Sequence, residues 1–248
     1  MKVRRIPITK QQLSGIPPDE RAILVLAGHV LNEINVIDKL TYLCSQSIQS
    51  SDWIGKANAM QSFVLVRVLC GKLDEAWAML QKAYFRTKVS HTYNTVLDQE
   101  AQASLAALKS YFSKSNDISR VRDEFAFHFD KKHALAEVPA DAIDEDMSMY
   151  LPHNGRAGHS LFYFADFLMN RSLMDAINAK APALSLESLL RDLRAAVVDL
   201  NKFLLGLMYS VITLRIDKAS LEGSATEVDV GHVPSSTRKA MPYFVEIP

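Results

Sequence analysis

The chain has 248 residues, 48% of them hydrophobic, which is enough to bury a sizeable core. Its 28 basic and 28 acidic side chains give a formal net charge of zero, so no global basic field attracts nucleic acid or an anionic membrane. Any contact with nucleic acid must therefore come from a local patch. The two cysteines, Cys44 and Cys70, lie in apolar helical patterns without metal-ligand spacing, which predicts buried, reduced thiols.

The first ten residues carry basic side chains with no apolar core behind them, unlike a secretory signal. The longest charge-free apolar run, residues 203–214, is well short of the roughly 20 residues that a membrane-spanning helix needs. We therefore expect a cytoplasmic protein that does not cross a membrane.

The first half of the chain predicts long helices. Residues 1–16 are polar and are expected to be irregular. Two prolines followed by Asp19 and Glu20 then mark the start of a helix that extends to about residue 47. A second helix is expected over residues 53–85.

The apolar stripe of the second helix changes phase at Cys70 and Gly71, which predicts a kink or a register change there. Residues 86–92 are polar and are expected to form a connection. The next apolar stripe predicts a third helix over residues 93–113.

Residues 136–165 differ in character from the helical segments. An acidic run is followed by two short apolar segments, 147–151 and 160–164, on either side of a turn-rich centre at 152–158. This pattern predicts a small β-hairpin.

The last part of the chain returns to helical periodicity, with helices expected over residues 166–178 and 186–217. Residues 203–214 are apolar on nearly all sides, which predicts burial in the core or against another subunit. The polar segment 218–248 ends in an apolar group at 243–247, as expected for an arm that docks on the protein.

Together these elements predict an all-α fold, an up-and-down bundle of long helices with a small hairpin inserted before the last two. The expected organisation is one helical domain over residues 1–217, containing the insertion at 136–165, followed by a C-terminal arm over 218–248.

The stretch over residues 117–129 combines helical periodicity with groups that can do chemistry. Asp117 is a good N-cap, and the apolar residues recur at three- and four-residue spacing, which predicts a fourth helix that fades near Lys132. Arg122 and His128 flank the apolar stripe. A permanently charged guanidinium and an imidazole that titrates near neutral pH are therefore expected on one short helix.

Arg122, Asp123 and His128, in the wording R-D-E-F-A-F-H after two long helices and a shorter one, resemble the motif of the HEPN superfamily (higher eukaryotes and prokaryotes nucleotide-binding domain). In that family an arginine and a polar residue precede a histidine at this spacing. A second arginine–histidine hit, Arg86 and His91, lies in the expected polar connection. We interpret it as a loop and set it aside.

The resemblance implies metal-independent cleavage of RNA, without a cofactor, across the interface of a homodimer. His128 would transfer a proton between the ribose 2′-hydroxyl or the leaving oxygen and solvent, and Arg122 would stabilise the charge of the phosphorane. The product would carry a 2′,3′-cyclic phosphate. Asp123, Asn32 and Glu33 are expected to support these groups, and the expected contacts to RNA are Arg120, Lys131 and Lys132.

Residues six apart on an ideal helix point about 120° away from each other, so Arg122 and His128 flank one face. A partner motif across a two-fold axis could bring them together. The resemblance suggests a bacterial toxin or defence setting, with an antitoxin protein as one partner.

Two other interpretations stay open. The first is a HEPN-like nucleotide-binding or protein-interaction module without catalysis, which Asp130 and the zero net charge favour. The second is a purely structural pair, in which Arg122 contacts an acid on a neighbouring helix and His128 fills a gap. Two sets of side chains have the types that bind a metal ion, His29 with Glu33, and His153 and His159 with the acids at 144–146. His29 and Glu33 better fit a polar strip that faces solvent or a buried hydrogen bond, and the second set better fits a solvated hairpin loop.

Overall fold

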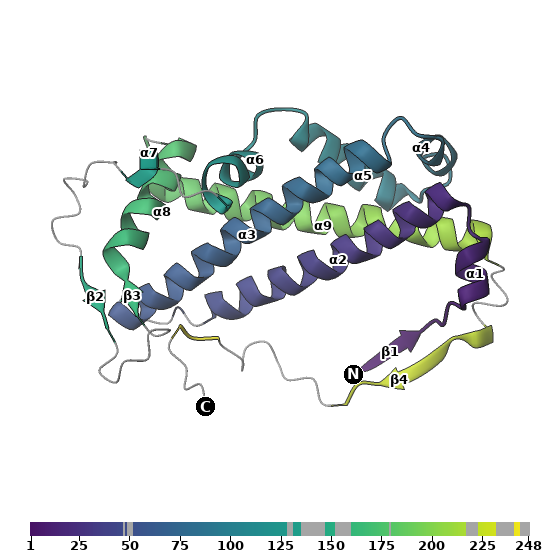
Figure 1. Ribbon diagram of the computed structural model, residues 1–248, viewed down its shortest axis with the longest axis horizontal. Helices are drawn as coiled ribbons and strands as arrows, with labels where there is room; N and C mark the ends of the chain where they lie inside the picture. The colour runs from purple at the N-terminus through teal and green to yellow at the C-terminus, as the bar shows by residue number, and fades with distance from the viewer. Residues whose placement is uncertain are drawn as a thin grey trace. The chain divides into compact units, whose positions relative to one another are not determined.

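The computed structural model describes residues 1–46, 48, 52–127, 131–134, 147–151, 160–178, 180–216, 223–231 and 241–243. Over these residues the chain is all-α, with long helices and two small antiparallel sheets of two strands each (Figure 1). The predicted helical bundle with a small hairpin is thus confirmed.

The helices are α1 (Lys10–Gly15), α2 (Pro18–Ser45), α3 (Trp53–Ala83), α4 (Lys88–Tyr93), α5 (Gln99–Phe112), α6 (Asp117–Val121), the π-helix η1 (Arg122–Ala126), α7 (Lys131–Ala134), α8 (Tyr163–Asn178) and α9 (Pro182–Arg215). The strands are β1 (Lys2–Arg5), β2 (Met149–Tyr150), β3 (Leu161–Phe162) and β4 (Thr226–Asp229). The long helices α2, α3 and α9 and the helix α8 all lie close to their expected ranges.

The chain forms two compact units, each assembled from three separate segments. Unit 1 contains Met1–Asn35, Glu75–Lys114 and Ala195–Ser235, and unit 2 contains Val36–Asp74, Ser115–Arg194 and Ser236–Pro248. The long helices α2, α3 and α9 each contribute one part to each unit. The expected division into residues 1–217 and an arm over 218–248 stays a prediction.

Unit 1 has a buried polar cluster around Glu20, in the first turn of α2. Arg215 donates from Nε to Glu20 Oε2 and from Nη2 to Oε1, both at 2.6 Å. Tyr93 donates its hydroxyl to Glu20 Oε2 at 2.6 Å. Glu20 is 8% exposed, and the hydrogen bonds from Arg215 hold its pKa below the ordinary value despite burial. The cluster therefore joins the start of α2, the end of α4 and the end of α9.

Close helix packing in unit 1 depends on a glycine. A Cβ atom on Gly206 of α9 would lie 2.5 Å from the Cβ of Ala101 on α5. Ala101 is 1% exposed and has no flexible side chain that could move aside. Residue 206 is therefore restricted to glycine by this contact.

The N-terminal segment is ordered, so the prediction of an irregular 1–16 is wrong. Strand β1 pairs antiparallel with β4, from Lys2 opposite Asp229 to Arg5 opposite Thr226, and the purple and yellow arrows of Figure 1 lie side by side. Helix α1 begins with a capping box between Thr9 and Gln12. A partner strand more than 220 residues away gives no local pattern in the sequence.

The segment after α3 also differs from its prediction. The expected connection at 86–92 contains α4, whose N-cap Thr87 accepts a hydrogen bond from the Ser90 N–H. Helix α5 begins at Gln99, six residues later than expected, because Asp98 caps it by accepting from the Ala101 N–H at 2.7 Å. A cap residue therefore starts each of these two helices at a position that periodicity alone does not reveal.

The predicted hairpin is present in unit 2, with Met149 opposite Phe162 and Tyr150 opposite Leu161. Leu161 and Tyr163 are buried against α3, and the partly buried Tyr243 from the C-terminal segment packs against them. The Tyr243 N–H donates to Asn58 Oδ1 at 2.8 Å, and its hydroxyl donates to the Ser160 carbonyl at 2.7 Å. This residue docks as expected, and the rest of the predicted apolar group, 244–247, lies outside the described residues.

Helix α3 runs unbroken through Cys70 and Gly71, where a kink or register change was expected. Gly71 allows a close contact with Phe127, because a Cβ atom there would lie 2.3 Å from Phe127 Cε2.

One described helical stretch, Leu184–Arg215, is long and apolar enough to cross a membrane, although a core helix passes the same test. The expectation that the chain does not cross a membrane stays a prediction.

We expect Glu20→Gln to lower the free energy of unfolding at pH 7 by about 2 kcal/mol, because Arg215 loses its ionic acceptor. A carboxylate whose pKa is lowered by folding stabilises the protein above its ordinary pKa of 4.5, and that contribution is lost as the pH falls through the folded value. Urea unfolding of both proteins should therefore converge in acid. Glu227→Gln, which loses only the exposed Lys2 pair, is the control, and equal losses would contradict the assignment.

We expect Gly206→Ala to lower the free energy of unfolding by about 1–2 kcal/mol, because the clash with Ala101 exceeds the gain in helix propensity. The swap Ala101→Gly with Gly206→Ala restores the space and should return the stability close to wild type. A double-mutant cycle from urea unfolding measures this coupling. Additive losses would mean that the two residues do not constrain each other.

Candidate functional site

The segment with the Arg122 motif is not one regular helix. Helix α6 ends at Val121, and the five residues Arg122–Ala126 form a π-helical turn. The N-cap of α6 is Asn116 instead of the expected Asp117. Asn116 accepts a hydrogen bond from the Ser119 N–H at 2.8 Å. The predicted helix extending to about Lys132 is therefore wrong. Single π-helical turns are rare and occur frequently at functional sites.

The described residues of the apolar stripe predicted over 117–129 face the interior of the protein. Ile118, Val121 and Phe125 are at most 5% exposed. Phe129 and His128 lie outside the described residues. The expected position of the imidazole beside this stripe therefore stays a prediction.

Arg122 contacts two carboxylates of unit 2. Its Nη1 donates to Asp123 Oδ1 at 2.9 Å, and its Nε lies 3.7 Å from Asp74 Oδ2. Ser119 also donates to Asp74, from Oγ to Oδ1 at 2.6 Å. The Arg122 side chain keeps 36% of its surface exposed. Asp123 thus contacts Arg122 as expected, whereas Asp74, on α3, was missed because only tertiary packing brings it here.

Arg120 has a structural contact. Its Nη1 donates to the Ala176 carbonyl of α8 at 2.8 Å and lies 3.7 Å from Asp117 Oδ1. Burial raises the pKa of Asp117, and the charge of Arg120 opposes this shift. The guanidinium expected to contact RNA therefore joins α6 to α8. Of the other two expected RNA contacts, Lys131 is exposed, and the side chain of Lys132 lies outside the described part of the chain.

His133 follows Lys131 and Lys132 in the sequence, but it is part of the packing of unit 2. Its side chain is buried, with Nδ1 3.2 Å from Ser172 Oγ and Nε2 3.7 Å from Glu124 Oε2. Its ring centroid is 4.2 Å from that of Phe125. This histidine packs α7 against η1 and α8, a role that its basic sequence neighbours concealed.

Asn32 and Glu33 belong to unit 1, whereas Arg122 and Asp123 belong to unit 2. Asn32 is exposed, and Glu33 Oε1 lies 3.9 Å from His29 Nε2. Among the residues that the structure describes, no three His, Cys, Asp or Glu side chains form a group suited to a metal ion. His153 and His159, with the acids at 144–146, lie outside the described residues.

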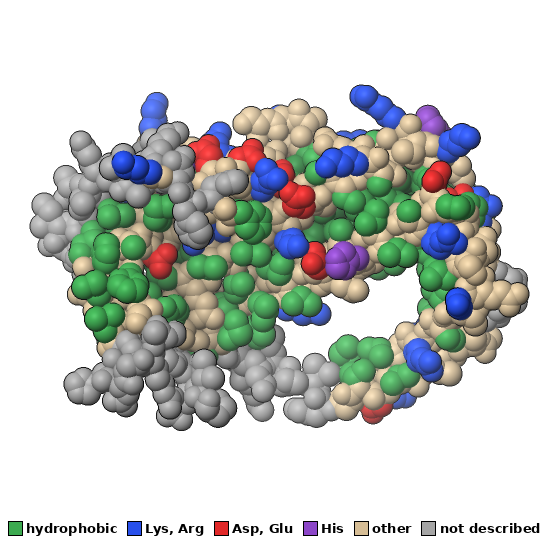
Figure 2. Space-filling view, viewed as in Figure 1, with side chains coloured by type: hydrophobic (Ala, Val, Ile, Leu, Met, Phe, Trp, Pro, Cys, Tyr) green, Lys and Arg blue, Asp and Glu red, His purple; other side chains and the backbone are tan. Residues whose placement is uncertain are grey.

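Charges of both signs are interspersed on the face that Figure 2 shows, with hydrophobic side chains between them. Around Arg122 the described side chains are mainly acidic, since Asp74 and Asp123 contact it and Glu124 follows in the same turn. The local field therefore orients a cation more effectively than it attracts a phosphate chain.

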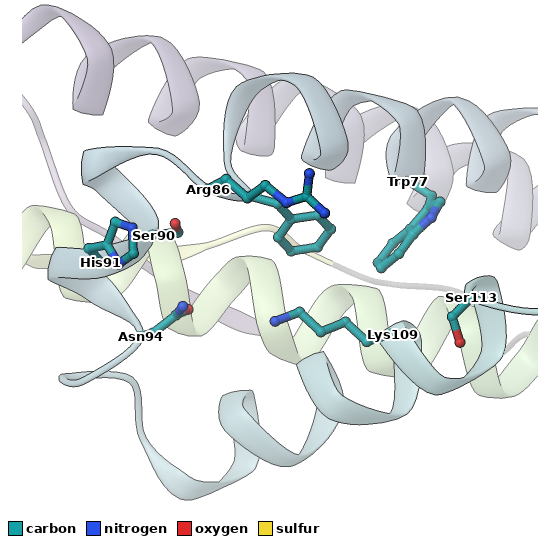
Figure 3. Close-up of a pocket in the computed structure, with 8 residues that line it drawn as sticks. Trp77, Arg86, Ser90, His91, Asn94, Lys109 and Ser113 are labelled. Atoms are coloured by element: carbon teal, nitrogen blue, oxygen red, sulfur yellow. The ribbon is translucent and has the colours of Figure 1, made fainter.

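The second arginine–histidine pair, which was set aside as a loop, requires a correction. His91 lies on α4, and both Arg86 and His91 line one cavity of about 390 Å³ in unit 1 (Figure 3). The polar segment 86–92 predicts an irregular connection, so neither the helix after Thr87 nor the cavity was expected. The cap was the one local signal that could have revealed the helix.

We expect Arg120→Ala to lower the free energy of unfolding by about 1–2 kcal/mol, because the Ala176 carbonyl loses its donor. Lys131→Ala, at an exposed position, should stay within about 0.5 kcal/mol of wild type. Urea unfolding of both variants measures the difference. Equal stabilities would mean that Arg120 has no structural role.

Comparisons with protein-family models, with curated proteins and with solved structures found no match for this chain.

Proposed function

We propose that the chain is a HEPN-like, metal-independent endoribonuclease that acts as a homodimer, with Arg122 and His128 as a composite catalytic pair. The observation that supports this proposal most directly is the guanidinium of Arg122. It opens a π-helical turn, is held by Asp123, and keeps about a third of its side chain exposed.

A guanidinium held in this way suits the chemistry of RNA cleavage. The 2′-hydroxyl attacks the adjacent phosphate, and the pentavalent intermediate carries additional negative charge on its equatorial oxygens. A donor already oriented toward that charge needs little reorganisation in the transition state. Asp123 accepts a hydrogen bond from Nη1 of Arg122, and a phosphate would approach the exposed part of the same side chain.

His128 would supply the proton transfers, as a base for the 2′-hydroxyl and as an acid for the leaving 5′-oxygen. In a homodimer the histidine of one subunit would complement the arginine of the other. The bacterial toxin or defence setting, the antitoxin partner and the cytoplasmic location are parts of the same proposal.

One observation favours a second candidate, a HEPN-like nucleotide-binding or protein-interaction module without catalysis. Arg122 faces two carboxylates, Asp74 and Asp123, so its charge is already compensated within unit 2. On this alternative the guanidinium joins η1 to α3 and performs no chemistry.

RNA cleavage in EDTA separates the two candidates. We expect wild type to cleave and to leave 2′,3′-cyclic phosphate ends, because the pair needs no metal. Arg122→Ala and His128→Ala should each lose activity by about 100-fold or more, the usual effect of removing an acid, a base or a charge stabiliser.

Arg171→Ala is the matched control in unit 2, because it removes an arginine that pairs with Asp175 at 3.2 Å on its own helix. It should cleave like wild type. Circular dichroism shows whether each variant is folded. Equal cleavage by all four proteins would exclude Arg122 and His128 as the catalytic pair, and no cleavage by wild type would favour the second candidate.

A further inference from the structure

We propose that the cavity in unit 1 binds a small phosphate monoester that carries a flat ring. The cavity has a volume of about 390 Å³, within the range of small-molecule sites, and lies among α3, α4 and α5 (Figure 3). It shares no residue with the Arg122 site, so this proposal does not rest on the proposed nuclease.

Three basic side chains lie around the cavity. Arg86, His91 and Lys109 line it, and no Asp or Glu is among the described residues that do. Arg86 and Lys109 form no ion pair with a described carboxylate, in contrast to Arg122. Two permanent charges and an imidazole match the double negative charge of a phosphate monoester better than the single charge of a carboxylate.

A neutral donor is fixed beside these charges. Figure 3 shows the Lys109 ammonium pointing toward Asn94. The buried Tyr84 donates its hydroxyl to Asn94 Oδ1 at 2.8 Å, which leaves the Asn94 amide nitrogen as a donor for another group. A phosphate oxygen is an acceptor that fits this arrangement.

The lining also contains aromatic side chains, and these are firmly packed. Trp77 is 9% exposed and stacks on Phe112, with centroids 5.1 Å apart and planes 15° apart. The ring of Phe85 meets that of Trp77 edge-on, with centroids 5.0 Å apart. The Lys109 ammonium lies over the Phe85 ring, 5.1 Å from its centroid. The indole Nε1 of Trp77 is buried without a hydrogen-bond partner among the described residues. An apolar wall beside cations suits a ligand with both a flat ring and an anionic group.

The backbone at Arg86 supports a functional origin of the cavity. Arg86 has a φ of 61°, the left-handed conformation, where α3 ends and where glycine is favoured. The neighbouring turn is held by Thr87, which donates from Oγ1 to the Tyr84 carbonyl at 2.6 Å. An arginine retained where glycine would be less strained indicates that its side chain is needed.

Calorimetric titration of the full chain tests the proposal with phenyl phosphate, inorganic phosphate and phenol. We expect phenyl phosphate to bind with a Kd below about 1 mM, inorganic phosphate at least about tenfold more weakly, and phenol not at all. Tryptophan fluorescence of Trp53→Phe, in which Trp77 is the remaining tryptophan, should change over the same concentration range.

Arg86→Gly and Lys109→Met should each weaken phenyl phosphate binding by about tenfold or more. Arg86→Gly relieves the left-handed strain, so its melting temperature should rise by a few degrees, and its loss of binding could not be attributed to unfolding. Lys82→Met, which removes an exposed lysine in the last turn of α3, should bind like wild type.

Phenyl phosphate that fails to saturate wild type would overturn the proposal, as would equal binding by wild type, Arg86→Gly and Lys109→Met. Inorganic phosphate that binds as tightly as phenyl phosphate would overturn the flat-ring part. Cleavage of RNA by the Arg122 and His128 variants is measured separately, so the two proposals fail independently.

Discussion

The buried carboxylate of Glu20 connects three helices of unit 1. Its two oxygens accept three short hydrogen bonds, two from Arg215 and one from Tyr93. Removing a partner from such a cluster is destabilising, because a buried charge is left without compensation. The start of α2 and the ends of α4 and α9 therefore keep their relative positions within this unit. Tyr93 ends α4, so the same cluster fixes the helix that presents His91 to the cavity.

The long helices could be predicted because their causes are local. Prolines and acids start α2, and apolar residues at helical spacing define α3 and α9. The hairpin could be predicted because two short apolar segments lie on either side of a turn-rich centre in the sequence. Strand β1 could not be predicted, since its backbone is satisfied by β4 at the other end of the chain. Helix α4 was concealed by its polar composition, because periodicity alone does not reveal a short helix stabilised by the Thr87 cap.

In the candidate sites too, contacts between sequence neighbours could be predicted, and contacts made by tertiary packing could not. The contact between Arg122 and Asp123 was predictable because the two are neighbours in the sequence. Asp74 approaches Arg122 only through the packing of α3, and Arg120 finds the Ala176 carbonyl 56 residues away. The π-helical turn has no sequence signal of its own. The pair of Arg86 and His91 was visible in the sequence, but its importance depends on Lys109 and Trp77, which the fold brings to the same cavity.

The assembly of each unit from three distant segments has a consequence for synthesis. Unit 1 lacks its last segment until residues 195–235 have left the ribosome, and β1 has no partner until β4 follows. Unit 2 likewise needs the part of α9 before Ala195 and the docking of Tyr243. The parts of α2 and α3 that pack against these later segments therefore lack their partners during much of translation, a situation in which apolar surface favours aggregation and the binding of chaperones.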